Sequence, residues 1–235
     1  MAMPVWREIY GALRREIAEG VYRTGDKLPT EKELSGRFDV NRHTVRRALA
    51  ELTGEGAIYV RRGSGAYVAE GVIDYRLGAD VKFSRAIREI GRTPCHHLLS
   101  SEIGPATERI ARHLSLRPGA PVVTIETTAE ADGLPILYAQ RHFPQERFTA
   151  LPADFEKEGS ISGALARYGV VDYRRAWTKV TAQAPSRRIA AHLRQPDVQP
   201  VLRAEALNLD MAGQPIEYTL AYWAGGRAQF VIEPE

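Results

Sequence analysis

Hydrophobic residues near the start of the chain recur at the spacing of an α-helix. Trp6, Ile9, Leu13 and Ile17 are three or four positions apart, so they fall on one face of a helix. Gly20 follows the last turn and suits the left-handed conformation that ends many helices. The pattern therefore predicts an amphipathic first helix with one buried stripe.

Two further helices are predicted, separated by a short break at residues 39–40. Thr30 precedes residues 31–33 (Glu-Lys-Glu) in a capping-box pattern, and Asn41 is a good N-cap for the next helix. In that next helix the apolar side is expected to hold Val45, Ala48, Leu49 and Leu52. The opposite side is expected to hold Arg42, His43, Arg46 and Arg47. A helix with one buried stripe and a cationic opposite face fits the major groove of DNA.

A small hairpin follows the basic helix. Residues 58–60 and 66–68 read as short strands that flank a Gly-Ser-Gly tip at residues 63–65. Basic helices are often only solvated surfaces, and residues 1–70 hold just 12 Lys and Arg against 10 Asp and Glu, so charge alone does not decide. The order of cap, turn, cationic helix and hairpin does, and it indicates a winged helix-turn-helix that binds DNA.

Three motifs carry a family resemblance. LPTEKEL (28–34), VNRHTVRRAL (40–49) and RRGSGAYV (61–68) resemble the N-terminal domain of GntR-type bacterial transcription regulators. Lys32 stands where an arginine is usual and Asn41 where a hydroxyl residue is usual, yet both still donate hydrogen bonds to phosphate. The resemblance implies a double-stranded DNA operator as partner. The candidate contact residues are Lys32, Asn41, Arg42, His43, Thr44, Arg46, Arg62 and Gly63.

The second half of the chain contains an internal repeat. Residues 121–126 match residues 200–205, and residues 133–138 match residues 213–218. Each copy reads as strand, turn and strand, and two like hairpins predict a continuous antiparallel sheet. Helices are expected at residues 81–90, 105–116, 160–168 and 186–194. The predicted fold class is therefore α+β, a winged helix-turn-helix followed by helices packed on an antiparallel sheet.

This second half resembles the UTRA effector domain of the HutC-type branch of the GntR family, over residues 72–233. The motifs are FSR (83–85), ADGLPI (131–136), GSIS (159–162) and GQPIEY (213–218), and two of them are also similar to repressors of phosphonate-utilisation operons. The resemblance implies a small-molecule effector on the sheet, with an anionic group held by serines at helix starts. The candidate effector-binding residues are Ser84, Arg85, Arg141, Ser160, Ser162, Glu217 and Tyr222.

The chain departs from this family in its arginines. The family often has arginines on the first hairpin strand and near the last strand, whereas residues 125–129 and 222–224 contain none. Arg85, Arg141 and Arg227 are candidate replacements or, equally, solvated surface residues. A Glu126 in the pocket disfavours a bare phosphate and favours an amine or hydroxyl, so we expect an anionic or zwitterionic effector. Serines at helix starts are also explained by simple capping.

Length and composition suit two domains. We expect a DNA-binding domain at residues 1–70, a linker at 71–78 whose extended run can pair with the second domain, and an effector domain at 79–235. Cys95 is the sole cysteine, which excludes an internal disulfide framework and fits a reducing compartment. No run approaches the ~18 apolar residues that span a membrane, and no signal peptide is apparent, so we expect a cytoplasmic protein without membrane contact.

Other sites and functions carry less weight. Residues 95–97 (Cys-His-His) suggest a metal site, but adjacent strand residues point to opposite faces, so we expect no metal and no cofactor. The UTRA sheet resembles that of chorismate lyase, so a lyase acting on a small acid is an alternative, distinguished by turnover. A protein-interaction adaptor is a third reading, distinguished by the lack of salt-dependent DNA binding. A regulator is expected to be a homodimer on a palindromic operator, because one helix reads few base pairs.

Overall fold

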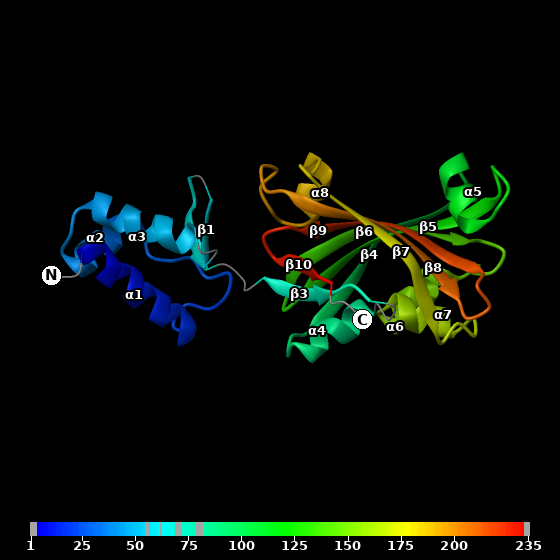
Figure 1. Ribbon diagram of the computed structural model, residues 1–235, viewed down its shortest axis with the longest axis horizontal. Coiled ribbons are helices and arrows are strands. Elements are labelled where there is room, and N and C mark those ends of the chain that lie inside the picture. The colour runs from blue at the N-terminus through cyan, green and yellow to red at the C-terminus, as the bar shows by residue number, and fades with distance from the viewer. Residues whose placement is uncertain (1–3, 55–56, 62, 69–71, 79–81, 233–235) are drawn as a thin grey trace. The chain divides into compact units, whose positions relative to one another are not determined.

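The chain forms two compact units in the computed structural model, Met1–Val72 and Ile73–Glu235 (Figure 1). The structure describes residues 4–54, 57–61, 63–68, 72–78 and 82–232. Each unit has its own hydrophobic core. None of the helices in these described ranges is long and apolar enough to cross a membrane.

The first unit is the predicted winged helix-turn-helix. Its helices are α1 Val5–Ala18, α2 Glu31–Phe38 and α3 Arg42–Gly54, and its strands are β1 Ile58–Arg61 and β2 Gly65–Val68. The two strands pair antiparallel as a hairpin. Ile9 and Leu13 of α1 are buried against Leu34 of α2 and Val45 of α3, which confirms the predicted apolar stripes. This core holds α3 in place with its opposite side in solvent.

The predicted helix ends of this unit are confirmed. Gly20 follows α1 with φ +76°. Thr30 and Glu33 form the capping box of α2, and Asp39 ends that helix in the left-handed conformation. The Oδ1 atom of Asn41 accepts a hydrogen bond from the backbone N–H of Thr44 at 2.9 Å, so Asn41 caps α3.

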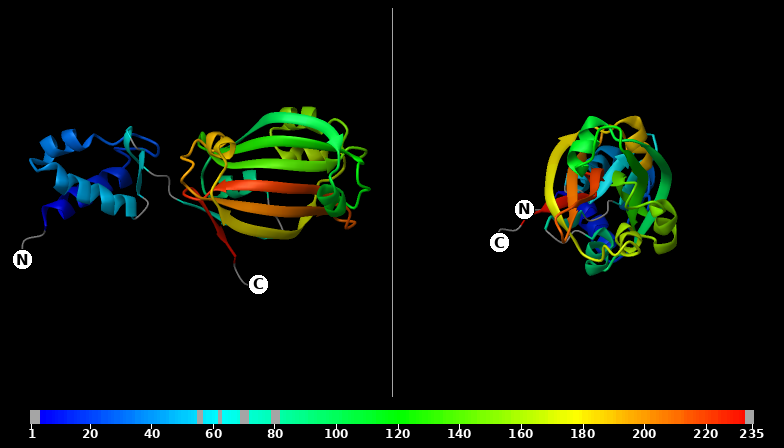
Figure 2. Two further views of the ribbon diagram at one scale, coloured as in Figure 1. Left: turned by 90° about the horizontal axis from the view of Figure 1, so that it is seen from above. Right: turned by 90° about the vertical axis from the view of Figure 1, so that its right-hand side faces the viewer.

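The second unit is built on one six-stranded antiparallel sheet in the order β4-β5-β6-β9-β8-β7, seen from above in Figure 2. Its strands are β4 Pro94–Pro105, β5 Pro121–Ala131, β6 Leu134–Pro144, β7 Tyr173–Gln183, β8 Val201–Asp210 and β9 Pro215–Ala224. The two predicted hairpins are β5–β6 and β8–β9, and they meet through the β6–β9 pair. The repeat therefore forms the middle of the sheet, and β4 and β7 form its edges.

Helices cover both faces of this sheet. They are α4 Phe83–Glu89, α5 Glu108–Leu114, α6 Leu151–Glu158, α7 Ile161–Ala166 and α8 Arg187–His192. On β5, Val123 and Ile125 pack with α6 and α7, whereas Val122 packs with α5, because successive strand residues face opposite sides. Figure 1 shows α4, α6 and α7 on one face and α5 and α8 on the other. Only α6 had not been predicted, and the other four helices are shorter than expected.

A two-stranded parallel ladder completes the second unit. It joins β3 Ile73–Arg76 to β10 Ala228–Val231. The structure thus places residues 73–78 of the predicted linker, 71–78, within the second unit, and four of these six residues form β3. Ile73 and Tyr75 alternate with exposed residues and are buried in its core, which explains why the extended run pairs there.

Candidate DNA interface and effector cavity

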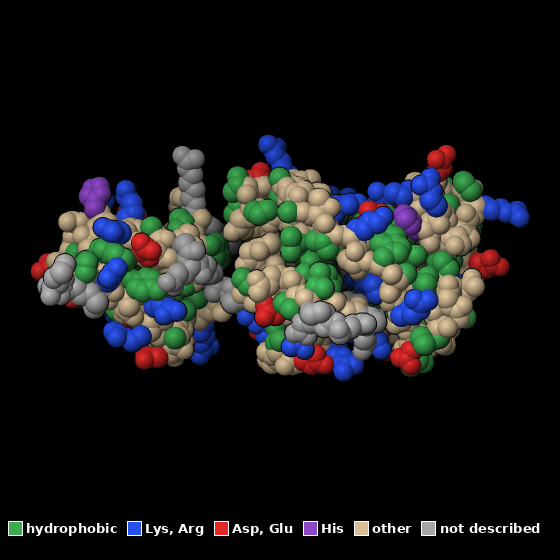
Figure 3. Space-filling model, in the orientation of Figure 1, with side chains coloured by type: hydrophobic (Ala, Val, Ile, Leu, Met, Phe, Trp, Pro, Cys, Tyr) green, Lys and Arg blue, Asp and Glu red, His purple; other side chains and the backbone are tan. Residues whose placement is uncertain are grey.

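The side of α3 that faces away from the core is cationic. Arg42, His43 and Arg46 are exposed, while Val45 and Ala48 are fully buried. In Figure 3 a histidine and basic side chains project from the side of the first unit where α2 and α3 lie. The predicted separation of the two sides of α3 is therefore confirmed. Such a face can enter a major groove without disturbing the core.

Arg46 is held by a neighbour from α2. Its Nη2 atom lies 3.1 Å from Glu31 Oε2 and its Nε atom 3.3 Å from Oε1, in a largely exposed pair. The hydrogen bond from Arg46 is the main cause of a lowered pKa of Glu31. Exposed ion pairs contribute little to stability, so Arg46 can exchange Glu31 for DNA at small cost.

The remaining predicted DNA contacts differ in environment. Lys32 is exposed on α2. Asn41 and Thr44 are joined by hydrogen bonds through Asn41 Oδ1, which leaves the amide end of Asn41 as the group for a phosphate. Gly63 is exposed at the hairpin tip with φ +76°. Arg62 lies outside the described residues.

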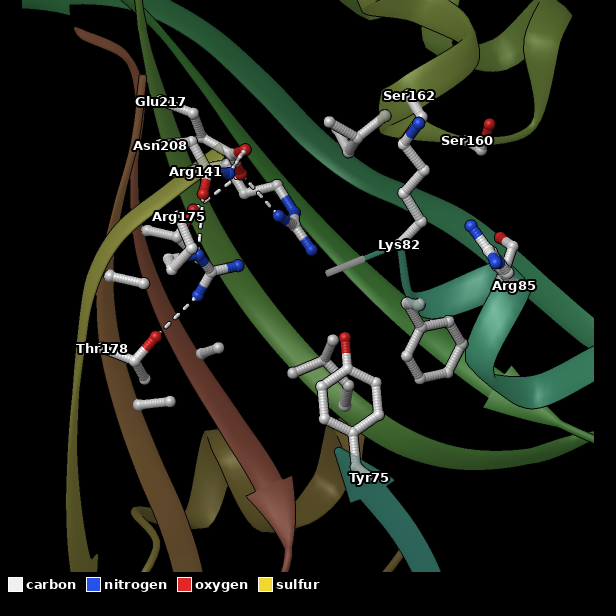
Figure 4. Close-up of a pocket in the computed structure, with 18 of the residues that line it drawn as sticks. Tyr75, Lys82, Arg85, Arg141, Ser160, Ser162, Arg175, Thr178, Asn208 and Glu217 are labelled. Atoms are coloured by element: carbon white, nitrogen blue, oxygen red, sulfur yellow. Dashed lines mark hydrogen bonds and ion pairs between the residues drawn. The ribbon is translucent and has the colours of Figure 1, made fainter. Parts of the chain in front are cut away.

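The second unit contains a cavity of about 200 Å³ on the face of the sheet covered by α4 and α7 (Figure 4). Strands β3 and β10 contribute Tyr75 and Phe230 to its wall. The structure brings together six of the seven predicted effector-binding residues in this wall: Ser84, Arg85, Arg141, Ser160, Ser162 and Glu217.

The seventh residue, Tyr222, lies elsewhere. On β9 the residues at odd positions, such as Glu217 and Trp223, line the cavity, so Tyr222 points to the opposite face. There it packs with Tyr138, with 6.0 Å between ring centroids. The sequence prediction that Tyr222 shares a site with Glu217 is therefore wrong, because residues five positions apart on one strand face opposite sides of the sheet.

Glu126 also lies on that opposite face. It accepts hydrogen bonds from Gln140 Nε2 at 2.9 Å and from Arg188 of α8. It does not line the cavity. The sequence prediction that Glu126 favours an amine or hydroxyl on the effector is therefore wrong, because the side chain of Glu126 points away from the cavity.

A buried polar network forms one end of the cavity. Glu217 is 1% exposed and accepts hydrogen bonds from Arg141, from Asn208 Nδ2 at 2.7 Å and from Thr219 Oγ1 at 2.6 Å. Burial works to raise the pKa of Glu217, but the charge of Arg141 and these hydrogen bonds hold that pKa below its usual range. Glu217 is thus an ionised internal group that orients Arg141 into the wall.

Arg175 belongs to the same network and had not been predicted. Its Nε atom donates to Asn208 Oδ1 at 2.7 Å and its Nη1 atom to Thr178 Oγ1 at 3.0 Å. Burial lowers the pKa of Arg175. It lies on β7, an edge strand whose residues show no apolar alternation, so no periodic signal marked which way Arg175 points.

The three predicted serines all make internal hydrogen bonds. Ser160 caps α7 by accepting from the N–H of Gly163 at 3.1 Å, and Ser84 Oγ lies 2.8 Å from His96 Nε2. Ser162 Oγ lies 2.8 Å from the hydroxyl of Tyr173. These contacts fix the serines in the wall, and they support capping as the role of Ser160.

Two family models match the chain. The model for bacterial regulatory proteins of the gntR family matches residues 6–68, and the UTRA domain model matches residues 89–229. The chain belongs to the GntR family. It is a transcriptional regulator with an N-terminal DNA-binding unit and a C-terminal UTRA effector unit.

Known relatives span nearly the whole of this GntR regulator. The uncharacterized HTH-type transcriptional regulator RB1450 of Rhizobium meliloti is 32% identical over 99% of this chain and 96% of its own length. The transcriptional repressor PhnF of Mycolicibacterium smegmatis is 30% identical over 88% of this chain and 84% of its own. The crystal structure of PhnF from Mycobacterium smegmatis superposes with a TM-score of 0.69 at 27% identity, covering 97% of this chain and 99% of that one.

The three candidate replacements for the missing arginines of this GntR regulator lie in different places. Arg85 and Arg141 line the cavity, and Arg85 pairs with Glu89 on the outside of α4. Arg227 instead donates to the backbone oxygens of Pro135, Leu193 and Arg194. Arg227 therefore connects three backbone segments, whereas Arg175 lines the cavity together with Arg85 and Arg141.

The alternation expected at residues 95–97 is observed. Cys95 Sγ lies 3.6 Å from His97 Nε2 on one side of β4. His96 points to the other side, where its ring meets Phe83 edge-on at 5.2 Å. Burial lowers the pKa of His96 to about 4, so its imidazole is neutral at pH 7.

Buried histidines make the effector unit sensitive to acid. His142 is 8% exposed, its Nδ1 atom lies 3.0 Å from Thr124 Oγ1, and burial lowers its pKa from 6.5 to about 4. The unfolded chain therefore takes up a proton near pH 6.5 that the folded unit does not take up until about pH 4. We expect the free energy of unfolding to be highest above pH 6.5. Between pH 6.5 and pH 4 it is expected to fall by up to about 1.4 kcal/mol per pH unit for each such histidine.

Denaturant unfolding at a series of pH values checks this. His142→Gln is expected to reduce the loss of unfolding free energy between pH 6.5 and pH 4. The matched variant His97→Gln, at an exposed position, is expected to leave this loss unchanged. Equal slopes in His142→Gln and the parent chain would contradict the assignment.

Proposed function

We propose that this chain is an effector-responsive repressor that binds operator DNA through α3 and releases it when a small anion fills the cavity. The observation that carries the proposal is that one chain combines an exposed cationic recognition helix with a cavity whose wall contains partly buried arginines. The relatives NagR of Bacillus subtilis and PhnF of Mycolicibacterium smegmatis, both named transcriptional repressors, support the sign of regulation. Such a regulator acts on DNA in the cytoplasm.

The contacts proposed for the operator follow from the exposed side of α3. Arg42 and Arg46 enter the major groove and read bases, with His43 beside them. Lys32, Asn41 and Thr44 contact phosphates, and the wing residues Arg62 and Gly63 approach the minor groove. These phosphate contacts predict that operator binding weakens as the salt concentration rises, because each neutralised phosphate releases counterions.

Assembly as a homodimer is the second part of the proposal. One α3 reads only a few base pairs, and a two-fold dimer doubles the site on a palindromic operator. The apolar stripes of the first unit are used in its own core, so the effector unit is the expected dimer contact. We expect sedimentation velocity to show a dimer both free and on operator DNA; a monomer in both conditions would refute it.

The switch is proposed to run through the start of the effector unit. Strand β3 follows directly on the boundary between Val72 and Ile73 and contributes Tyr75 to the cavity wall. Residues 69–78 are the proposed hinge, and β3 is the part of this segment that is paired within the effector unit. An effector that touches β3 therefore acts at the end of the hinge that is anchored in the effector unit. It changes DNA binding only if it has different affinities for two arrangements of the dimer.

Calorimetry of the effector with and without operator DNA tests this coupling. By linkage, if the effector weakens operator binding by a given factor, operator DNA weakens effector binding by the same factor, typically about 5- to 150-fold. A scrambled duplex of equal length serves as the control. Equal effector affinities with operator, with scrambled duplex and without DNA would overturn the proposed switch.

Turnover of a small molecule distinguishes the alternative function, a lyase, from the proposed regulator. In the described part of the cavity the carboxylate is that of Glu217, and its oxygens are already bound by Arg141, Asn208 and Thr219. This arrangement favours a binding site over acid–base chemistry. A regulator leaves the bound small molecule unchanged after prolonged incubation, and product formation would instead support the enzyme.

A further inference from the structure

The effector cavity has two chemically different walls. One wall is the network of Arg141, Arg175, Asn208 and Glu217, which lies together in Figure 4. The other wall is an aromatic cluster of Tyr75, Phe83, Trp223 and Phe230. Within the cluster the ring centroids of Tyr75 and Trp223 lie 4.3 Å apart, and those of Trp223 and Phe230 lie 5.2 Å apart. A ligand that fills the cavity therefore meets Arg141 and Arg175 at one end and rings at the other. The cavity is also lined by Lys82, Arg85 and Arg88, at the start of and along α4.

The polar wall carries an excess of positive charge. Arg175 donates to two neutral oxygens, those of Asn208 and Thr178, while Glu217 is paired directly with Arg141. The Nε atom of Arg141 is buried without a hydrogen-bond partner among the described residues. Two partly buried guanidiniums thus share one carboxylate. A charge that is largely shielded from water and lacks a counter-charge is costly. One oxyanion on the ligand would complete the wall, because guanidinium binds such groups with directed hydrogen bonds.

The same wall is unsuited to a ligand ammonium group. Glu217 Oε1 accepts from Arg141 and Thr219, and Oε2 accepts from Asn208. Glu217 is the one carboxylate among the described residues that line the cavity. An ammonium group would meet guanidiniums of like charge, and repulsion is strong where water is excluded.

The aromatic wall determines the other half of the ligand. Tyr75, Phe83 and Trp223 are each at most 8% exposed, and Ala204 and Ala221 continue this surface. Hydroxyl groups placed against rings and methyls lose their hydrogen bonds with water, whereas a flat apolar body gains contact area and ring stacking. A volume of about 200 Å³ is below the ~300–1,000 Å³ of sites for drug-sized ligands, so the body is small.

We propose that the effector is a small organic acid with one oxyanion group, an aromatic or otherwise apolar body and no ammonium group. The oxyanion lies against Arg141 and Arg175, and the body lies against Tyr75 and Trp223. This inference rests on the proposed function in taking the cavity as the effector site. It narrows the anionic or zwitterionic class to an apolar acid.

Four probes test the proposal by calorimetry on the full chain. They are 3-phenylpropionate, L-phenylalanine (the same skeleton with an ammonium group), acetate (no body) and glucose 6-phosphate (an anion on a hydroxylated body). We expect 3-phenylpropionate to bind at least about 10-fold more tightly than each of the others. Binding of L-phenylalanine or glucose 6-phosphate that equals or exceeds it would overturn the proposal, as would no binding of 3-phenylpropionate at millimolar concentration.

A pair of arginine variants locates the oxyanion. Arg175→Gln is expected to weaken 3-phenylpropionate at least about 10-fold, whereas Arg174→Gln, at an exposed neighbour on β7 outside the cavity wall, is expected to leave its affinity unchanged. Melting curves of both variants confirm folding, and equal affinities would overturn the placement. These measurements need no DNA. A chain that does not bind an operator would therefore contradict the proposed function and leave this inference standing. Release of the operator by a phosphosugar would contradict this inference and leave the proposed function standing.

Discussion

Glu217→Gln is expected to lower the free energy of unfolding of the effector unit by about 3–5 kcal/mol, the range found when one partner of a buried ion pair is removed. The substitution keeps the shape of the side chain but removes its charge. Arg141 and the neighbouring Arg175 then remain partly buried without a carboxylate, while Asn208 still has an oxygen to bind. Urea unfolding of the full chain measures the change.

Two further variants make this prediction specific. Glu146→Gln, at an exposed position of the same unit, is expected to change the stability by no more than about 0.5 kcal/mol. Adding Arg141→Met to Glu217→Gln removes one of the two unpaired cations, so part of the lost stability is expected to return. A loss of less than 1 kcal/mol in Glu217→Gln alone would show that the network does not bind the carboxylate in its charged form.

Arg42→Ala and Arg46→Ala are each expected to weaken operator binding about 10- to 100-fold, the range for removing a bidentate contact to a base. Both side chains are exposed on the side of α3 opposite the core, so the fold is expected to tolerate their removal. Fluorescence anisotropy at fixed salt, with operator and scrambled duplexes, separates lost base reading from lost charge. The operator preference itself should shrink in these variants.

Two controls accompany the arginine variants. Arg15→Ala removes an equal charge from the exposed surface of α1 and should reduce affinity for both duplexes only slightly. Glu31→Gln removes the residue that holds Arg46 in the free protein, so operator binding should not weaken. Unchanged operator affinity in both Arg42→Ala and Arg46→Ala would remove α3 from the proposed interface.

The first unit was predictable because its signals are local. The capping box at Thr30, the N-cap at Asn41 and the left-handed Gly20 each depend on residues within one helical turn. The apolar stripe of α3 depends on its own 3.6-residue period. The hairpins of the second unit were found for the same reason, since each repeat copy contains both of its strands and the turn between them.

The cavity was predicted less completely because its composition depends on strand register over long distances. Residues of β6, β7, β8 and β9 meet in one wall, and a shift of one residue moves a side chain to the other face of the sheet. Tyr222 and Glu126 were assigned to the wrong face in this way. Arg175 was missed because the sequence of β7 shows no clear apolar alternation that would reveal which way its side chains point.

The pairing of β3 with β10 has a practical consequence for protein engineering. Ile73 pairs with Ala228 and Arg76 with Val231, so the first and last strands of the effector unit run side by side. Three residues of strand separate the level of Ile73 from that of Val231, about 10 Å. Domains with close ends tolerate insertion into a surface loop of another protein. Residues 73–231 are therefore expected to form a module that can be grafted into a fluorescent or enzymatic reporter, with the cavity-wall residues Tyr75 and Phe230 next to the two graft points.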